Sequence, residues 1–127
     1  MTQIFNPVPR YKDALAAIDF LKEAFGFEER SVAKGDDEAT VVHAELVFNG
    51  AVVGVSSDSE GSPFPAGPST FYVVLDHPDE HHARAVAAGA EIVMELTDQP
   101  YGSREYAAKD PEGNVWCFGT YRPEPPA

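Results

Sequence analysis

Three of the four histidines lie close together and have a spacing that can bind a metal ion. His77 and His81 are four residues apart, so on a helix their imidazoles would face the same side, with His82 beside them. We interpret the cluster instead as a solvated helix start next to Asp79 and Glu80, because no group that would orient the imidazoles is evident. A metal ion bound there would be adventitious.

His43 and Glu45 form a second candidate site in a predicted strand. Alternate residues of a strand share a face, so both lie opposite an apolar face that we expect to pack under a helix. That apolar face consists of Val42, Ala44, Leu46 and Phe48. His43 and Glu45 would then face a cavity. There they could act as a general base, contact a ligand or form a hydrogen-bonded pair with each other. A β-bulge that reversed the parity would make the pair structural.

Arginine and aromatic residues supply further candidate ligand contacts. Arg104 would clamp an anion through its planar guanidinium, or pair with one of the many carboxylates of the chain. Tyr101 lies in a loop that would line the mouth of a cavity, and Phe64 and Tyr72 would form aromatic walls for a flat ligand. The predicted ligand-binding residues are therefore His43, Glu45, Phe64, Tyr72, Tyr101 and Arg104.

Cys117 is the lone cysteine, which excludes an internal disulfide and fits a reducing compartment. No base stands beside it, so we expect a small buried side chain and not a nucleophile. The neighbouring Trp116 should face the opposite side of its strand, toward the core. The start of the chain lacks a basic region followed by an apolar run, so we expect a cytoplasmic protein.

The composition is that of a globular protein with a strong acidic excess. With 127 residues, 43% of them hydrophobic, the chain predicts one compact domain. The formal charge of −12 excludes nucleic acid and anionic membrane surfaces as partners, since phosphate binding needs clustered Lys and Arg. The charge keeps the protein soluble or favours a cationic ligand. No run of residues is long enough to span a bilayer.

Periodicity and turn signals predict the elements that position these residues. In the first half we expect an extended segment over 4–11, a helix from the N-cap Asp13 to Gly26, a strand over 27–33 and a hairpin of 40–48 with 51–57. The buried stripe of that helix is Ala14, Ala17, Ile18, Leu21 and Phe25.

The second half repeats this order. We expect a strand over 69–76, a helix from Pro78 to Gly89, a strand over 90–96 and a hairpin of 104–109 with 115–121. The turn of that hairpin is Asp110-Pro-Glu-Gly-Asn114, where Asp110 can cap the turn. The predicted buried stripe of the second helix is Ala83, Val86 and Ala87.

A constant offset supports an internal duplication. Gly50 and Gly113, Gly26 and Gly89, and Asp13 and Asp76 are each 63 residues apart. We divide the single domain into a module 1–57, a linker 58–68 rich in Ser, Gly and Pro, a module 69–122 and a frayed tail 123–127. The fold class is α+β, with two tandem βαβββ modules.

The two βαβββ modules and their motifs resemble the glyoxalase/bleomycin-resistance/extradiol-dioxygenase superfamily, also called vicinal oxygen chelate. The motifs are Phe25-Gly26, Ala87-Ala-Gly-Ala90 and Asp110-Pro-Glu-Gly-Asn before Trp116. His43-Ala-Glu-Leu46 and Tyr101-Gly-Ser-Arg104 resemble its small bacterial bleomycin-resistance-like and glyoxalase-like branch. The resemblance implies curled sheets around a cavity, a homodimer, and a ligand site in the cavity or between two chains.

The resemblance also locates the positions where family enzymes hold a divalent metal. They fall at Asn6, Gly54, Ser69 or Thr70, and Cys117. Only Cys117 is a strong ligand, whereas a stable site needs three or four. We therefore expect no metal and no cofactor.

The function that remains is a metal-free protein that sequesters a small molecule, a cationic or aromatic antibiotic or metabolite, in a cavity or dimer groove. The alternative is a lyase or isomerase of the glyoxalase type, with His43 or Glu45 as general base and with or without a divalent metal. A third possibility is an interaction domain whose cavity is filled by its own side chains.

Overall fold

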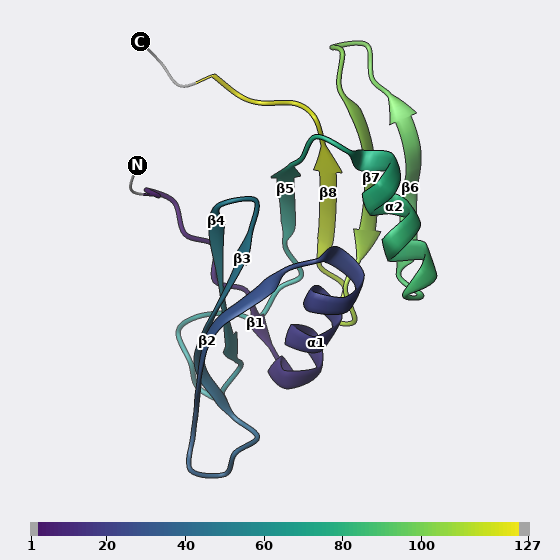
Figure 1. Cartoon of the computed structure of the whole chain (residues 1–127). Coiled ribbons are helices and arrows are strands. Elements are labelled where there is room, and N and C mark those ends of the chain that lie inside the picture. The colour runs from purple at the N-terminus through teal and green to yellow at the C-terminus, as the bar shows by residue number, and fades with distance from the viewer. Residues whose placement is uncertain (1–2, 125–127) are drawn as a thin grey trace.

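The computed structural model describes residues 3–124, and Figure 1 shows their arrangement. The first half consists of β1 (Arg10–Tyr11), α1 (Ala14–Phe25), β2 (Glu28–Lys34), β3 (Val41–Phe48) and β4 (Ala51–Ser57). The second half consists of β5 (Thr70–Val74), α2 (Pro78–Ala87), β6 (Glu91–Asp98), β7 (Arg104–Lys109) and β8 (Val115–Gly119). The expected order of elements is confirmed in both halves.

The two halves form separate four-stranded sheets with the same connectivity. The strand orders are β1-β4-β3-β2 and β5-β8-β7-β6, and in each sheet the first strand of the module pairs in parallel with the last. All other pairs are antiparallel. Identical topology in the two halves confirms the internal duplication and the α+β fold class.

α1 follows the sequence prediction closely. The side chain of Asp13 caps its N-terminus by accepting a hydrogen bond from the backbone of Ala16, and Gly26 ends it with a left-handed backbone. All five predicted residues of the apolar stripe are buried, together with Ala24. Figure 1 shows α1 between the two sheets, so this stripe serves the core of both halves.

The predicted buried stripe of α2 is wrong. Val86 is 50% exposed, and Ala83 and Ala87 are exposed as well. The face that packs inward consists of Pro78, His81, His82 and Ala85, of which the two histidines are partly buried. These residues have the spacing i, i+3, i+4 and i+7, which is one face of a helix. Two of the four positions on this face are histidines and not apolar residues.

A bulge changes the expected face of β3. Ala33 pairs with His43, but the next residue, Lys34, pairs with Val41, so Val42 is the extra residue. Val42 is consequently 61% exposed, contrary to its assignment to the apolar face, and Val41 is buried in its place. Beyond the bulge the prediction holds, since Ala44 and Leu46 are buried and Phe48 packs against the core.

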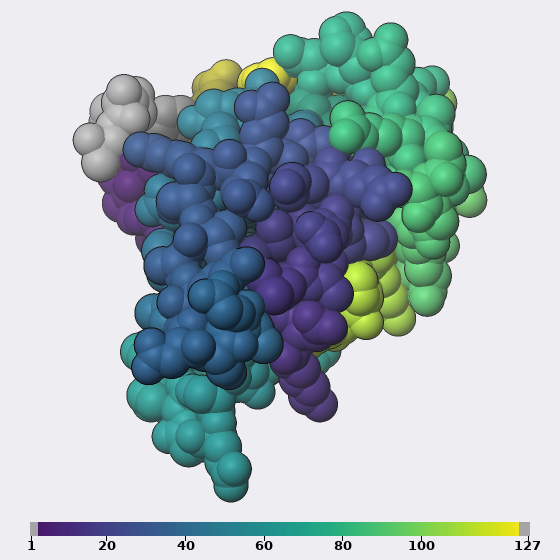
Figure 2. Space-filling model, turned by 60° about the horizontal axis from the view of Figure 1, so that its bottom comes forward, coloured from purple at the N-terminus to yellow at the C-terminus, as the bar shows by residue number. Residues whose placement is uncertain are grey.

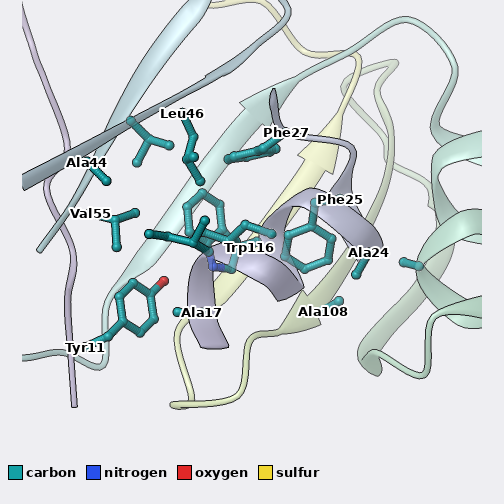
Figure 3. Packing of buried hydrophobic residues seen from close by; sticks show 14 of the residues in the cluster. Tyr11, Ala17, Ala24, Phe25, Phe27, Ala44, Leu46, Val55, Ala108 and Trp116 are labelled. Carbon is teal, nitrogen blue, oxygen red and sulfur yellow. The ribbon is translucent and has the colours of Figure 1, made fainter. Parts of the chain in front are cut away.

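Trp116 lies at the centre of the core, as predicted, with Leu46, Val55 and Phe25 around it (Figure 3). Its indole donates a hydrogen bond to the buried carboxylate of Asp110 at 3.0 Å. The same oxygen of Asp110 accepts from the Tyr11 hydroxyl at 2.6 Å. The capped turn before β8 therefore connects the first module to the second.

The space-filling view shows how the two halves and the linker are placed. The N-terminal and C-terminal halves occupy opposite sides of the molecule, and the linker projects at one end (Figure 2). Over residues 3–124, no helix is long and apolar enough to cross a membrane. The proposed boundaries 1–57, 58–68 and 69–122 stay predictions, and most of the tail 123–127 lies outside the described residues.

Candidate functional site

Two hollows border β5, the edge strand of the second sheet. The larger one, here called the groove, has a volume of about 720 Å³ and runs between β5, β4 and the segment that precedes β1. The smaller one, here called the tyrosine pocket, has a volume of about 520 Å³. Tyr72 on β5 lines both of them.

The walls of the groove are mostly apolar and aromatic. β5 is an edge strand of the second sheet, whereas β4 lies inside the first sheet and the segment before β1 runs along it, with the Gly54 N–H bonded to the Pro7 carbonyl at 2.9 Å. The main aromatic and aliphatic lining residues are Phe5, Phe48, Val52, Phe71, Tyr72 and Trp116. Such a surface suits an apolar or aromatic molecule.

The tyrosine pocket places three tyrosine rings around one carboxylate. Its lining residues are Tyr72, Tyr101, Glu105, Tyr121 and Pro123. The Tyr121 ring is nearly perpendicular to the other two, at 83° to Tyr72 and 81° to Tyr101, with ring centroids 6.4 and 5.8 Å apart. The rings come from β5, the loop before β7 and the segment after β8.

Glu105 lies at the floor of this pocket, with only 3% of its surface exposed. Its Oε1 accepts a hydrogen bond from the Tyr101 hydroxyl at 2.7 Å. Its Oε2 accepts from the hydroxyls of Tyr72 at 2.8 Å and Ser103 at 2.9 Å. Three hydroxyl donors therefore hold the carboxylate in one orientation.

These hydrogen bonds set the ionisation of the pocket. Burial raises the pKa of Glu105, but the hydroxyl donors outweigh burial, so the net pKa lies below its usual value. The same carboxylate raises the pKa of Tyr101 to about 12, chiefly by accepting its hydrogen bond. At neutral pH the pocket thus holds the Glu105 carboxylate beside the un-ionised phenols of Tyr72 and Tyr101, whose pKa values are both raised.

Gly119 on β8 makes this arrangement possible. It pairs with Glu105 across the β7–β8 ladder. A Cβ at this position would overlap both the Tyr72 hydroxyl and the side chain of Glu105. Only glycine lets the phenol and the carboxylate meet over β8.

His43 and Glu45 lie outside both hollows. They occupy the face of β3 opposite the buried Ala44 and Leu46, as predicted, and their side chains are 48% and 36% exposed. His43 Nε2 is 3.7 Å from Glu45 Oε2, and Glu45 also approaches Arg30. The structure shows an exposed polar cluster here, and a role in ligand binding or as a base stays a prediction.

Arg104 and Phe64 also lie away from the hollows. Arg104 forms the internal pairs that were the alternative to an anion clamp, 2.7 Å from Asp79 and 3.1 Å from Asp98. Phe64, in the linker, lies under the guanidinium of Arg10, 4.8 Å from the ring centroid. Of the six predicted ligand-binding residues, Tyr72 and Tyr101 are the two that meet in one pocket.

The interpretation of the histidine cluster as solvated is wrong for His81. Its Nε2 lies 2.8 Å from the Phe25 carbonyl oxygen and its Nδ1 lies 2.5 Å from the Tyr106 hydroxyl. A carbonyl only accepts, so Nε2–H donates and Nδ1 accepts from the phenol. His82 is bonded to Glu95 at 2.8 Å, so both nitrogens of His81 and one nitrogen of His82 already have hydrogen-bond partners.

The side chains at the family's metal positions do not fit a metal ion. Gly54 has no side chain, and Val8 and His43 lie against it. Thr70 and Cys117 share a face of the second sheet with Tyr72, whose phenol is committed to Glu105. Across residues 3–124, no three His, Cys, Asp or Glu residues are grouped to hold a metal.

Cys117 is partly buried on this face. Burial, and to a lesser extent the charge of Glu105, raise the pKa of its thiol to about 11. The thiol is therefore protonated at neutral pH and is a poor nucleophile.

Sequence reasoning missed Glu105 and Tyr121, although it singled out neighbours of both. The sequence did contain a signal for Glu105, because this carboxylate lies inside a predicted strand among small and aromatic residues. If such a strand is central in its sheet, the carboxylate is buried and must have hydrogen-bond partners or a function. Tyr121 was placed at the end of the last strand, without a role. What was lacking was the pairing of β7 between β6 and β8, which buries Glu105.

Comparison with known proteins agrees with this fold. The Glyoxalase/Bleomycin resistance protein/Dioxygenase superfamily model matches residues 7–118. Uncharacterized protein Mb0911c of Mycobacterium bovis is 34% identical over 116 residues, which is 84% of this chain and 76% of that protein.

Solved structures of the same fold are similar over nearly the whole chain. The crystal structure of TioX from Micromonospora sp. ML1 is 30% identical, covers 95% of this chain and 100% of its own, and has a TM-score of 0.76. Lactoylglutathione lyase from Agrobacterium tumefaciens has a TM-score of 0.71 at 20% identity, with 94% of each chain covered, and so shows the fold alone. The chain therefore belongs to the Glyoxalase/Bleomycin resistance protein/Dioxygenase superfamily.

Proposed function

We propose that this chain is a metal-free protein that binds a small cationic or aromatic molecule. The observation that carries the proposal is the groove beside β5, whose walls are built from aromatic and aliphatic side chains. Its volume of about 720 Å³ is in the range of pockets that enclose small molecules. The side chains at the family's metal positions support the metal-free part, since an asparagine, a glycine, a serine or threonine and a protonated thiol form no strong ligand set.

The groove is tested with the neutral fluorophore N-phenyl-1-naphthylamine, which becomes bright in apolar surroundings. We expect saturable binding that the variant Ala51→Trp weakens by about tenfold or more, because the indole would fill space at the groove wall. Ala51 is exposed on β4, so the substitution removes no core contact.

The matched control is Ala83→Trp, which adds the same indole at an exposed position of α2 outside the groove. Binding that is equally strong in both variants, or that never saturates, would contradict the proposed site. The metal-free part is tested by elemental analysis after dialysis against divalent ions. About one ion bound per chain would overturn it.

We also propose that the protein acts as a homodimer in the cytoplasm. The lone cysteine supports a reducing compartment. Ile4 and Phe5, which are 84% and 88% exposed, support a second copy as partner, and Phe5 borders the groove. A dimer interface at this point would cover the groove and add to its walls.

A further inference from the structure

We propose that the tyrosine pocket binds an alkylated ammonium group, such as a quaternary or tertiary amine, on the ligand of this protein. The inference rests on the proposed function, because it assigns the charged part of a ligand whose apolar part lies in the groove. It is carried by a buried carboxylate, three aromatic walls and the hydrogen bonds that fix two of these walls.

The carboxylate of Glu105 lacks a countercharge within the described part of the chain. The arginines nearest to it in sequence are committed elsewhere, Arg104 to Asp79 and Asp98, and Arg122 to Asp76 at 2.6 Å. Hydroxyl donors satisfy the oxygens of Glu105 but leave its charge in place. A carboxylate on a residue with only 3% of its surface exposed and with no ion pair favours a cation that enters the adjoining space.

The walls of the pocket have the geometry of a cation site. Faces of tyrosine rings carry negative potential and attract cations that lie within about 6 Å of the ring centroid. Tyr121 stands nearly perpendicular to Tyr72 and Tyr101, so the rings enclose a corner instead of stacking flat. The phenols of Tyr72 and Tyr101 are held in place by Glu105 itself, so two of the three walls are preorganised.

The hydrogen-bonding capacity of the pocket selects the kind of cation. Oε2 of Glu105 already accepts two hydroxyls and Oε1 accepts one, so little acceptor capacity remains for N–H donors. A guanidinium or a primary ammonium would lose water contacts here that the pocket does not replace. An alkylated ammonium brings few or no N–H groups, and its methyl groups fit the aromatic faces.

Tyr72 connects this pocket to the groove, because its side chain lines both. A ligand that binds both hollows would place an apolar or aromatic body between β4 and β5 and its ammonium group beside Glu105. The chemical class is therefore an amphipathic organic cation.

The test compares choline with its neutral isostere 3,3-dimethyl-1-butanol by NMR titration of the full chain. The two molecules have the same shape and differ in charge, so comparing their affinities distinguishes a cation-binding site from an apolar pocket. We expect choline to bind at least about tenfold more tightly, as cation–π and charge interactions predict. Equal binding of the two, or no binding of choline, would overturn the inference.

Two variants test the residues. Glu105→Gln keeps the shape and removes the charge, and Tyr121→Ala removes one wall, and each should weaken choline binding by about tenfold. Tyr121 is 47% exposed and its side chain makes no hydrogen bond within residues 3–124, so its variant should fold even if the other does not. Glu60→Gln is the control, since it removes an exposed charge in the linker. Choline binding that survives in Tyr121→Ala would contradict the site.

The outcome is separable from the proposed function. Choline is too small to need the groove, so Ala51→Trp should leave its binding unchanged while it weakens N-phenyl-1-naphthylamine. If the fluorophore binds in the groove and choline does not bind, the proposed cation site is contradicted and the proposed binding function of the groove is supported. If choline binds and the fluorophore does not, the proposal that the groove binds an apolar molecule is contradicted.

Discussion

At the scale of single residues, the tyrosine pocket depends on a position that has no side chain. Gly119 lies directly under the contact between Tyr72 and Glu105. Its backbone conformation is not left-handed, so the requirement for glycine is one of space. The phenol, the carboxylate and the glycine form a single packed unit.

The variant Gly119→Ala tests that unit. The added methyl would push the phenol and the carboxylate apart, so we expect choline affinity to fall by about tenfold or more. The free energy of unfolding should fall by about 1–3 kcal/mol, the usual range for overpacking in a tight site. Urea denaturation followed by Trp116 fluorescence measures the second effect.

The control for this variant is Gly35→Ala, in the turn between β2 and β3. A Cβ there meets Thr40 at 3.4 Å, an ordinary contact distance. It should change neither choline binding nor stability by a comparable amount. A Gly119→Ala protein that binds choline like the wild type would show that the pocket tolerates rearrangement of Glu105.

At the scale of elements, α2 shows where sequence patterns succeed and where they fail. Its start at Pro78 and the acidic residues of its first turn were predictable, because they follow from local backbone chemistry. Its buried face was not, because an imidazole counts as polar until its partners are known. His81 packs inward since the Phe25 carbonyl and the Tyr106 hydroxyl satisfy both its nitrogens, and these partners are 56 and 25 residues away.

The burial of His81 predicts a pH-dependent contribution to stability. Desolvation is the main cause that lowers the pKa of His81 below its usual value of 6.5 in the folded protein, and nearby Arg84 adds to it. The unfolded chain therefore takes up this proton at higher pH than the folded chain does. The contribution is fully present above pH 6.5 and is lost as pH falls from there through the lowered pKa of the folded state.

Urea midpoints at pH 7.5 and pH 5 measure this contribution in the wild type and in His81→Leu. The variant loses two partly buried hydrogen bonds, so it should be less stable at both pH values, by about 2 kcal/mol at pH 7.5. The difference between wild type and variant should shrink at pH 5, because only the wild type loses the His81 contribution. His77→Leu, at the exposed start of α2, is the control, and a constant difference for His81→Leu would contradict the assignment.

The same distinction between local and distant causes holds for β3 and for the site. Alternation placed His43 and Glu45 on the correct face, but the bulge that exposes Val42 depends on its pairing with β2. The duplication, the helix ends and the turns were predictable from local residues and a fixed offset. The tyrosine pocket was not, because it unites β5, β7 and the segment after β8, which only the folded sheet brings together.

At the scale of the whole molecule, the two halves leave apolar surface that one chain does not cover. α1 lies between the sheets and fills the core, whereas the groove and the segment before β1 stay open on the outside. Ile4 and Phe5 project from that segment with most of their surface exposed. Exposed apolar side chains beside a groove are typical of an interface.

We therefore expect a homodimer that depends on these two side chains. Size-exclusion chromatography with light scattering should give about twice the 13.7 kDa mass of the chain. The double variant Ile4→Ser, Phe5→Ser should shift the protein toward the monomer, because it removes apolar area that the partner would bury.

The matched control is Val86→Ser, which removes an exposed aliphatic side chain from the outer face of α2 and should leave the dimer intact. A wild-type protein that stays monomeric would contradict the homodimer. A dimer that survives the double variant but dissociates in Val86→Ser would instead place the interface on α2, remote from the ligand. The binding assay with N-phenyl-1-naphthylamine distinguishes these two interfaces independently. A dimer formed through the segment before β1 adds to the walls of the groove, so the affinity for the fluorophore should increase with protein concentration. A dimer formed through α2 leaves the groove unchanged, so the affinity should not depend on protein concentration.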